Sequence, residues 1–473
     1  MTPSKNKSGI SRRKFIYHTG CAALGCTTLF SSLINMKAIA AAAMDKGITS
    51  NGDYRALVCV LLNGGADTHN MLIPRSNSAY QAYALTRSNL AIPQNNILNL
   101  NHNAINGSLY GVHPSMPEIR SLFNSGKLSF ISNIGTLVEP VTKVQYLANS
   151  KPLPLGLFSH SDQAKHWQTG RPGEKNSYGW GGRIADLIQS QNNNQIINTG
   201  ISLDGTNQFQ SGLSEGGFAI KSADAIGIEG YGSNALYHNL RDVAIDNMID
   251  KDYQDLYEKT YINTLKSGKA GADELSAAMT GVPTFSTNFS SGTLSQKFRS
   301  VARIIAARET LGFTRQTFFI NYSGWDHHDD VLTSQEDKVP ELSKALSEFQ
   351  NTLQGMGVAN GVTTFTISDF GRTLTSNGNG SDHGWGGNMM VMGGSVEGGQ
   401  IFGNYPTLSM DSDLMLPRGV VLPTTSSTEY LSELALWFGI SPGDVNDIFP
   451  DLPNFFNTAG GGFPIGFLNP VNQ

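Results

Sequence analysis

Six runs of apolar and β-branched residues constrain the fold of this chain most strongly, because each is followed directly by Gly, Asn or Asp. The runs begin at Arg55, Lys127, Gln195, Gln316, Val362 and Asn388. Runs that are apolar at nearly every position are typical of strands buried on both faces of a sheet. We therefore predict a central sheet that is covered on both sides.

Helical patterns separate these runs, over residues 114–127, 295–313 and 339–358. Alternation of strand and helix requires crossover connections, which make neighbouring strands parallel. The predicted fold class is therefore α/β, a three-layer sandwich with a mostly parallel central sheet and helices on both faces. Residues 52–473 are predicted to form this single domain.

Residues 205–290 depart from the alternation. They hold a long polar helical pattern and no dense block of acidic residues and histidines. We predict that this segment is a helical cap inserted on the sheet, where it shapes the pocket without carrying the chemistry. It contains no motif that identifies a substrate.

The N-terminal residues 1–43 have the features of an export signal. A basic start containing Arg12 and Arg13 leads into a weakly apolar stretch that ends in small residues, Ala38-Ile39-Ala40. The arginine pair in "SRRKF" resembles a twin-arginine signal, and Cys26 leaves a lipoprotein signal as the weaker alternative. The resemblance implies that the twin-arginine machinery exports the folded protein to the periplasm or the medium.

The net charge of the chain argues against a nucleic-acid partner. The 473 residues carry a formal charge of -5, so the chain lacks the strong positive charge typical of nucleic-acid binding. With 52 glycines and 15% charged residues, the composition is that of a loop-rich globular enzyme. We expect no nucleic-acid partner.

Four short acidic blocks follow the α/β pattern. In chain order they hold Asp67, Asp326 with His328, Asp369, and Asp382 with His383. The ligand site of an open parallel sheet lies outside the carboxyl ends of its strands, so we expect the blocks to meet there. Gathered carboxylates repel unless a cation neutralises them. Oxygen ligands with imidazole suit Zn, Mn, Mg or Ca, and we predict one or two divalent ions.

Two adjacent histidines, His327 and His328, follow Asp326. The geometry of an extended chain indicates which of them binds the same cation as Asp326. Residues i and i+2 of an extended segment point to the same side. We therefore expect His328 to share the cation with Asp326, and His327 to point away.

The motifs "GGADTHN", "FSHSDQAKHWQTG", "SGWDHH", "ISDFGRT" and "SDHGWGGNMMVMGG" occur in this order. Over about Arg55 to Pro406 they resemble the exported bacterial family called domain of unknown function 1501, which is similar to the alkaline phosphatase and sulfatase superfamily. The resemblance implies a hydrolase of phosphate or sulfate esters, acting on a small or polymeric anionic ester. It also implies metal roles for Asp67, Asp326, His328, Asp369 and His383.

The same resemblance implies a nucleophile in "FSHSDQAKHWQTG", where Ser159 or Ser161 provides the hydroxyl and Ser159 is slightly favoured. A nearby cation lowers the pKa of such a hydroxyl. Arg372 is a candidate for holding an anionic oxygen with its fork of donors. The alternative for Arg372 is a salt bridge with a carboxylate at the end of the sheet.

Two departures from the superfamily pattern leave other functions open. Phe370 occupies the position where phosphatases place a metal-binding histidine, and the sulfatase Cys or Ser followed by Pro and Arg is absent. One metal is then poorly held or missing. The alternatives are an inactive exported or surface binding protein that keeps one structural cation, and a redox cofactor protein. The redox cofactor protein lacks support, because the sequence has no G-x-G-x-x-G or C-x-x-C motif.

Overall fold

The computed structural model describes residues 54–469, apart from 104–106, 195, 215, 224–225, 229–230 and 234. The export signal predicted at residues 1–43 lies outside the described residues. Within the described part of the chain, no helix combines the length and the apolar character needed to cross a bilayer.

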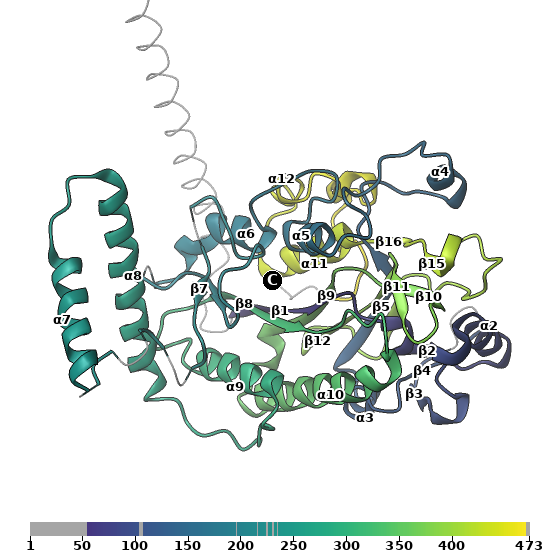
Figure 1. The fold of residues 1–473 in the computed structure, drawn as a ribbon, viewed down its shortest axis with the longest axis horizontal. Coiled ribbons are helices and arrows are strands. Elements are labelled where there is room, and N and C mark those ends of the chain that lie inside the picture. The colour runs from purple at the N-terminus through teal and green to yellow at the C-terminus, as the bar shows by residue number, and fades with distance from the viewer. Residues whose placement is uncertain are drawn as a thin grey trace, which may run out of the picture. The chain divides into compact units, whose positions relative to one another are not determined.

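Within the described residues, nine strands form the central sheet (Figure 1). Their order is β13 (Ile401–Phe402), β5 (Leu128–Gly135), β12 (Gly387–Gly393), β9 (Val362–Ser368), β1 (Arg55–Asn63), β8 (Arg315–Ser323), β6 (Gly200–Ser202) and β7 (Phe218–Ala219), with β16 (Thr425–Ser426) also paired to β5. β12 runs antiparallel to β5 and β9, and the other pairs are parallel. The predicted mostly parallel sheet is confirmed, and each of the six apolar runs contains one of its strands.

The register places several chain segments at one edge of the sheet. The last residue of β1, Asn63, pairs with the last residue of β8, Ser323, and Leu62 pairs with Ser368 at the end of β9. Because β12 is antiparallel, its first residue lies at this same edge, where Gly387 pairs with Ile134 of β5. The loop that enters β12 therefore meets the loops that leave β1, β8 and β9.

Helices cover both faces of the sheet, as predicted (Figure 1). One face carries α5 (His160–Thr169), α6 (Trp180–Ile188), α11 (Ser427–Phe438) and α12 (Val445–Ile448). The other carries α3 (Pro117–Asn124), α9 (Thr293–Ala306) and α10 (Val331–Gly355). The smaller elements are α2 (Asn77–Arg87), α4 (Lys143–Leu147), β2 (Leu72–Pro74), β3 (Leu98–Asn99), β4 (Tyr110–Val112), β10 (Arg372–Ser376), β11 (Ser381–His383), β14 (Met415–Leu416) and β15 (Val420–Val421).

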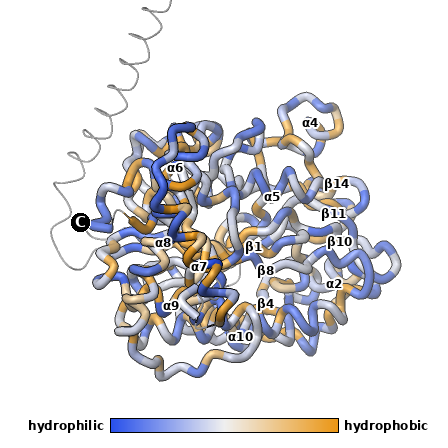
Figure 2. The backbone as a smooth tube through the Cα atoms, turned by 60° about the vertical axis from the view of Figure 1, so that its left-hand side comes forward, coloured by the Kyte–Doolittle hydropathy of each residue, from blue (hydrophilic) through white to orange (hydrophobic). Residues whose placement is uncertain are grey.

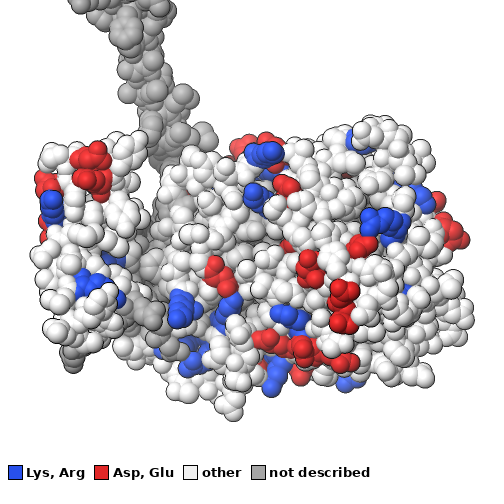
Figure 3. Space-filling view, viewed as in Figure 1, with Lys and Arg blue, Asp and Glu red and all other residues white. Residues whose placement is uncertain are grey.

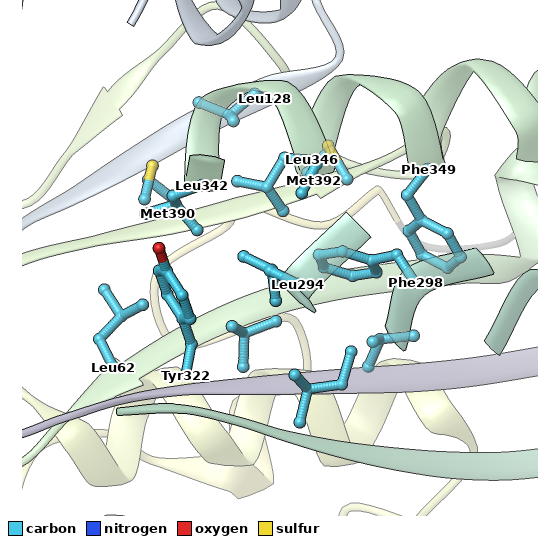
Figure 4. Close-up of a cluster of buried hydrophobic side chains, with 14 of the residues drawn as sticks. Leu62, Leu128, Leu294, Phe298, Tyr322, Leu342, Leu346, Phe349, Met390 and Met392 are labelled. Atoms are coloured by element: carbon cyan, nitrogen blue, oxygen red, sulfur yellow. The ribbon is translucent and has the colours of Figure 1, made fainter. Parts of the chain in front are cut away.

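The core between the sheet and α9 follows from the helical spacing of apolar residues. Leu294, Phe298, Val301 and Ile305 are spaced by four, three and four, and all are fully buried. Figure 4 shows Leu294 and Phe298 beside residues of α10 and the sheet, and the rings of Phe298 and Phe349 stack with centroids 4.7 Å apart. Each such buried side chain contributes about 1.5–3 kcal/mol.

Helix α10 begins earlier than the sequence indicates. The predicted helix started near Pro340, a residue favoured at the first helical position, but α10 starts at Val331 and contains Pro340 in its interior. An interior proline removes one main-chain hydrogen bond. The buried stripe that includes Leu342, Leu346 and Phe349 offsets this loss, because it packs into the core shown in Figure 4.

The segment predicted as a cap contains two helices, α7 (Leu236–Asp250) and α8 (Leu256–Met279), and the edge strand β7. The single long helical pattern is broken because the Asp255 side chain accepts the backbone N–H groups of Tyr257 and Glu258 and caps α8. Hydrophobic and hydrophilic residues are mixed along both helices (Figure 2). The side chains of Leu240, Tyr257 and Tyr261 are exposed. A capping role stays a prediction.

The face of the molecule shown in Figure 3 is mixed in charge. On the face shown in Figure 3, positive and negative side chains of the described residues occur in small interspersed groups. This pattern accords with the formal charge of -5 for the whole chain.

We predict that buried neutral histidines make the fold sensitive to mild acid. His113 follows β4 and is 3% exposed, and burial lowers its pKa to about 4, although the Asp67 charge partly opposes this. The unfolded chain takes up a proton near pH 6.5, so stability falls as pH drops from about 6.5 toward 4. His113→Asn, which can still accept the Ser115 N–H, should flatten this slope by about 1 kcal/mol per pH unit in urea unfolding. Identical slopes for the two proteins would refute the assignment.

Candidate metal centre

Among the described residues, four side chains from three separate segments converge at the carboxyl edge of the sheet. One ligand atom from each of His160, Asp326, His328 and His383 lies within 4.8 Å of the others. Asp326 Oδ1 is 3.0 Å from His328 Nε2 and 3.6 Å from His383 Nε2, and Asp326 Oδ2 is 3.4 Å from His160 Nε2. We call these four residues the metal centre.

The Gly-Gly turn after β1 brings the strand ends together. Gly64 has a φ of +117°, and a Cβ there would lie 2.6 Å from the backbone nitrogen of Asp326, so a side chain is excluded. The Gly64 N–H donates to Asp369 Oδ2 at 3.1 Å, and the Gly64 carbonyl accepts from Arg372 at 3.1 Å. The turn therefore joins the exits of β1, β8 and β9.

Each imidazole of the metal centre is held through its Nδ1 atom. His160 Nδ1 lies 2.8 Å from Asp369 Oδ2, and His383 Nδ1 lies 2.7 Å from the Phe158 carbonyl oxygen. His328 Nδ1 lies 3.4 Å from Asp382 Oδ1. In the tautomer that carries the proton on Nδ1, each ring can donate to this oxygen partner. The lone pairs on Nε2 then face the centre, which is the tautomer that binds a metal.

The donor set fits a divalent cation. His328 Nε2 and His383 Nε2 are 3.0 Å apart, which is close enough for both to bind one ion when each presents its lone pair. His160 Nε2 and Asp369 Oδ1 are buried without a hydrogen-bond partner among the described residues. Leaving such an atom unpaired costs about 1–3 kcal/mol, and a cation would relieve that cost. Three imidazoles favour zinc or another transition metal over magnesium or calcium.

Charge and burial shift the pKa values of Asp326 and Asp369 in opposite directions. Burial tends to raise the pKa of Asp326, but Arg372, His160 and His328 outweigh it and hold that pKa below its usual value. Burial raises the pKa of Asp369 in spite of its hydrogen bond to His160. Asp326 therefore stays ionised to lower pH than Asp369 does.

Arg372 has protein partners on each guanidinium nitrogen. The side chain is fully buried, and its NH1 atom donates to Asp326 Oδ1 at 2.9 Å. Its Nε and NH2 atoms donate to the Ser381 carbonyl at 3.1 and 2.7 Å. Arg372 was a candidate for holding a substrate oxygen, but the structure places it in the alternative role, a salt bridge that orients Asp326.

Asp382, a predicted ligand, lies behind His328 and outside the metal centre. It contacts the ring nitrogen that faces away from the centre, and it also accepts from Asn377 at 3.1 Å. Its role in this geometry is to orient His328. His327 turns away, because its Nε2 lies 2.8 Å from the Gly324 carbonyl and the residue is 7% exposed.

Asp67, another predicted ligand, is not part of the metal centre. It forms an ion pair with Arg87, the last residue of α2, and both side chains are 0% exposed. The guanidinium supplies the positive charge that the sequence analysis assigned to a cation. No motif marks Arg87, so this pairing could not be predicted from the sequence.

The segment predicted to carry a nucleophile contributes a histidine to the metal centre. His160 is the first residue of α5, and the Oγ atoms of Ser159 and Ser161 lie 3.3 Å from each other. The prediction named the hydroxyls of Ser159 and Ser161 and gave His160, which lies between them, no role. A signal was present, since His160 stands in a block with Asp162, as the other histidines of the metal centre stand beside aspartates.

Part of the chain matches the model of a protein family. Residues 237–445 match the family described as "Protein of unknown function (DUF1501)". The predicted family resemblance is confirmed. The matched range includes Asp326, His328 and His383 of the metal centre, and His160 lies before it. No curated protein matches the chain.

Several solved structures are distantly similar. A sulfatase, PsFucS1 from Pseudoalteromonas sp., has 12% identity and a TM-score of 0.35, covering 86% of this chain and 72% of its own. Lipoteichoic acid synthase LtaP from Listeria monocytogenes has 11% identity and a TM-score of 0.33, with coverages of 90% and 81%. Alkaline phosphatase from the Antarctic bacterium TAB5 has 9% identity and a TM-score of 0.30, with coverages of 84% and 99%. Likenesses this distant carry no weight for the chemistry.

We predict that the Asp67–Arg87 pair is structural. Arg87→Met should lower the free energy of unfolding by about 3–5 kcal/mol, because it leaves a buried carboxylate without its partner. The double variant Asp67→Asn, Arg87→Met should recover a large part of that loss. Urea unfolding of both variants measures the effect, and a loss below about 1 kcal/mol for Arg87→Met would contradict it.

Proposed function

We propose that this chain is a metal-dependent hydrolase of phosphate or sulfate esters that uses one divalent cation. The observation that carries the proposal is the convergence of three imidazole Nε2 atoms on Asp326, with each Nδ1 atom held by an oxygen. We also propose that the protein works in the periplasm or the medium, on the basis of the twin-arginine pattern at residues 1–43.

The metal centre is open to a substrate. The side chains of Asp326 and His328 are 45% and 42% exposed, whereas their supports Asp369 and Arg372 are fully buried. A bound cation supplies Lewis acidity, which polarises a phosphoryl or sulfuryl oxygen and lowers the pKa of a water molecule. The chain supplies rigid orientation, since the buried supports fix the exposed ligands before a substrate arrives.

The side chains at the metal centre provide ligands for a single cation. Arg87 neutralises Asp67, so this carboxylate needs no metal. The ring of Phe370 packs 4.8 Å from that of His160 and 4.6 Å from that of His383, measured between centroids. An apolar ring therefore lies where the superfamily resemblance implied a further ligand. The two-metal arrangement of the superfamily is not part of the proposal.

We propose water as the attacking group. The hydroxyls of Ser159 and Ser161 bond to each other, and the side chain that this segment sends to the metal centre is His160. In hydrolysis, water adds across the P–O or S–O bond, and an alcohol and an inorganic anion leave. Attack by serine remains a distinct alternative that mutation separates from attack by water.

Metal analysis of the purified mature protein tests the centre directly. We expect about one equivalent of a transition metal, most readily zinc, and metal-dependent turnover of an aryl phosphate or an aryl sulfate. His383→Ala should weaken metal binding at least about 10-fold, the scale seen when metal-site partners are lost. His238→Ala on α7 is the matched control and should bind metal normally. Stoichiometric metal without turnover would support the alternative of an exported binding protein with a structural cation.

Alanine variants of the two serines separate the nucleophiles. We expect Ser159→Ala and Ser161→Ala each to keep kcat within about tenfold, whereas losing a covalent nucleophile typically costs about 10⁴-fold or more. Single-turnover and steady-state rates with excess metal measure this. A loss of that larger size in either variant, with metal content unchanged, would overturn attack by water.

A further inference from the structure

A pocket of about 440 Å³ adjoins the metal centre. His328 and His383 form one part of its lining, and Tyr146, Leu416 and Val420 form an apolar part. The Tyr146 ring packs against Trp385 with centroids 5.9 Å apart, which supports the apolar side from behind. The pocket is large enough for the organic part of an ester whose reacting group lies at the metal centre.

The lining of this pocket also contains the positively charged Arg418 and the negatively charged Asp382. The Arg418 side chain is 72% exposed, and its NH2 atom donates to Asp382 Oδ2 at 2.5 Å. One bond leaves most of the five N–H donors of a guanidinium available. Asp382 lies between Arg418 and His328, so one carboxylate separates the guanidinium from the metal centre.

The backbone holds Arg418 in a conformation that arginine rarely adopts. Its φ is +65°, in the left-handed region, and it lies in a turn between β14 and β15. The Thr375 hydroxyl of β10 donates to the Arg418 carbonyl at 2.7 Å and ties this turn to the hairpin that carries His383. Non-glycine residues held with positive φ cluster at functional sites.

We propose that this pocket selects esters that carry a second negatively charged group, which Arg418 binds. The reacting group lies at the metal centre, an apolar or aromatic part lies against Tyr146 and Leu416, and the second anionic group reaches the guanidinium. Asp382 disfavours anions in the pocket, so the selectivity depends on Arg418. This inference rests on the proposed hydrolase and names its substrate class as doubly anionic aryl or alkyl esters.

Paired substrates test the inference on the zinc-loaded mature protein. We compare 4-nitrophenyl phosphate with an aryl phosphate that bears a carboxylate on the ring, and the corresponding pair of sulfates. The wild type should prefer the carboxylated ester about 10-fold or more in kcat/KM, mainly through KM, as expected for a charge-assisted hydrogen bond. Arg418→Gln should abolish the preference and Arg418→Lys should restore part of it. Because Arg418 also touches Asp382, the preference ratio within each variant is the readout.

Arg241→Gln on α7 removes a positive charge elsewhere and should leave the ratio unchanged. A ratio near one for the wild type, or an unchanged ratio in Arg418→Gln, would overturn the inference while turnover itself upholds the hydrolase.

Binding of phosphonates separates the two proposals if no ester is turned over. The P–C bond of phenylphosphonate and 4-carboxyphenylphosphonate resists hydrolysis, so calorimetry reports binding alone. Tighter binding of the carboxylated compound, lost in Arg418→Gln, would uphold the pocket although the hydrolase failed. Equal binding of the two compounds, or no binding of either, would overturn the pocket.

Discussion

The contacts at three Nδ1 atoms determine what the centre of this protein can do. Asp369, the Phe158 carbonyl and Asp382 each face one imidazole nitrogen, and the opposite nitrogens of His160, His383 and His328 converge on Asp326. Without these partners the rings could rotate or change tautomer, and the lone pairs would no longer point to one place. The fold serves this arrangement by bringing three strand exits and one strand entry to one edge of the sheet.

Arginines balance the carboxylates around the centre. Arg372 pairs with Asp326, Arg87 with Asp67, and Arg418 with Asp382. The three pairs differ in burial, and burial decides their roles. The fully buried Arg87–Asp67 pair supports the fold, and the buried Arg372 orients a ligand. The exposed Arg418 remains accessible to a substrate.

The parts of the centre that depend on strand ends were predictable from sequence. Asp326 with His328, and His383, each follow or precede an apolar run, and the period of two distinguished His328 from His327. Asp369 was also predicted as a ligand from a strand end, but it lies outside the metal centre and contacts His160 Nδ1. The antiparallel direction of β12 was not visible in its apolar pattern, which looks the same in both directions. Even so, it is this direction that brings His383 to the site.

Side-chain direction and long-range pairing explain why the contributions of His160 and Arg87 were not predicted. At the start of α5 successive residues turn by about 100°, so the pattern alone does not decide whether His160 or a neighbouring serine faces the sheet edge. The Asp67–Arg87 contact joins a loop to the end of a helix 20 residues later, and no local spacing encodes it. Family resemblance assigned Asp67 a metal role that the arginine has taken over.

X-ray absorption at the zinc edge of the metal-loaded protein tests the central claim most directly. Three imidazole nitrogens at about 2.0–2.1 Å, together with carboxylate or water oxygen at a similar distance, are the predicted first coordination sphere. His160→Ala should remove one imidazole from that sphere, whereas Ser159→Ala should leave it unchanged. A sphere with fewer than three imidazoles in the wild type, or one that His160→Ala does not alter, would contradict the assignment of His160, His328 and His383 as the ligands.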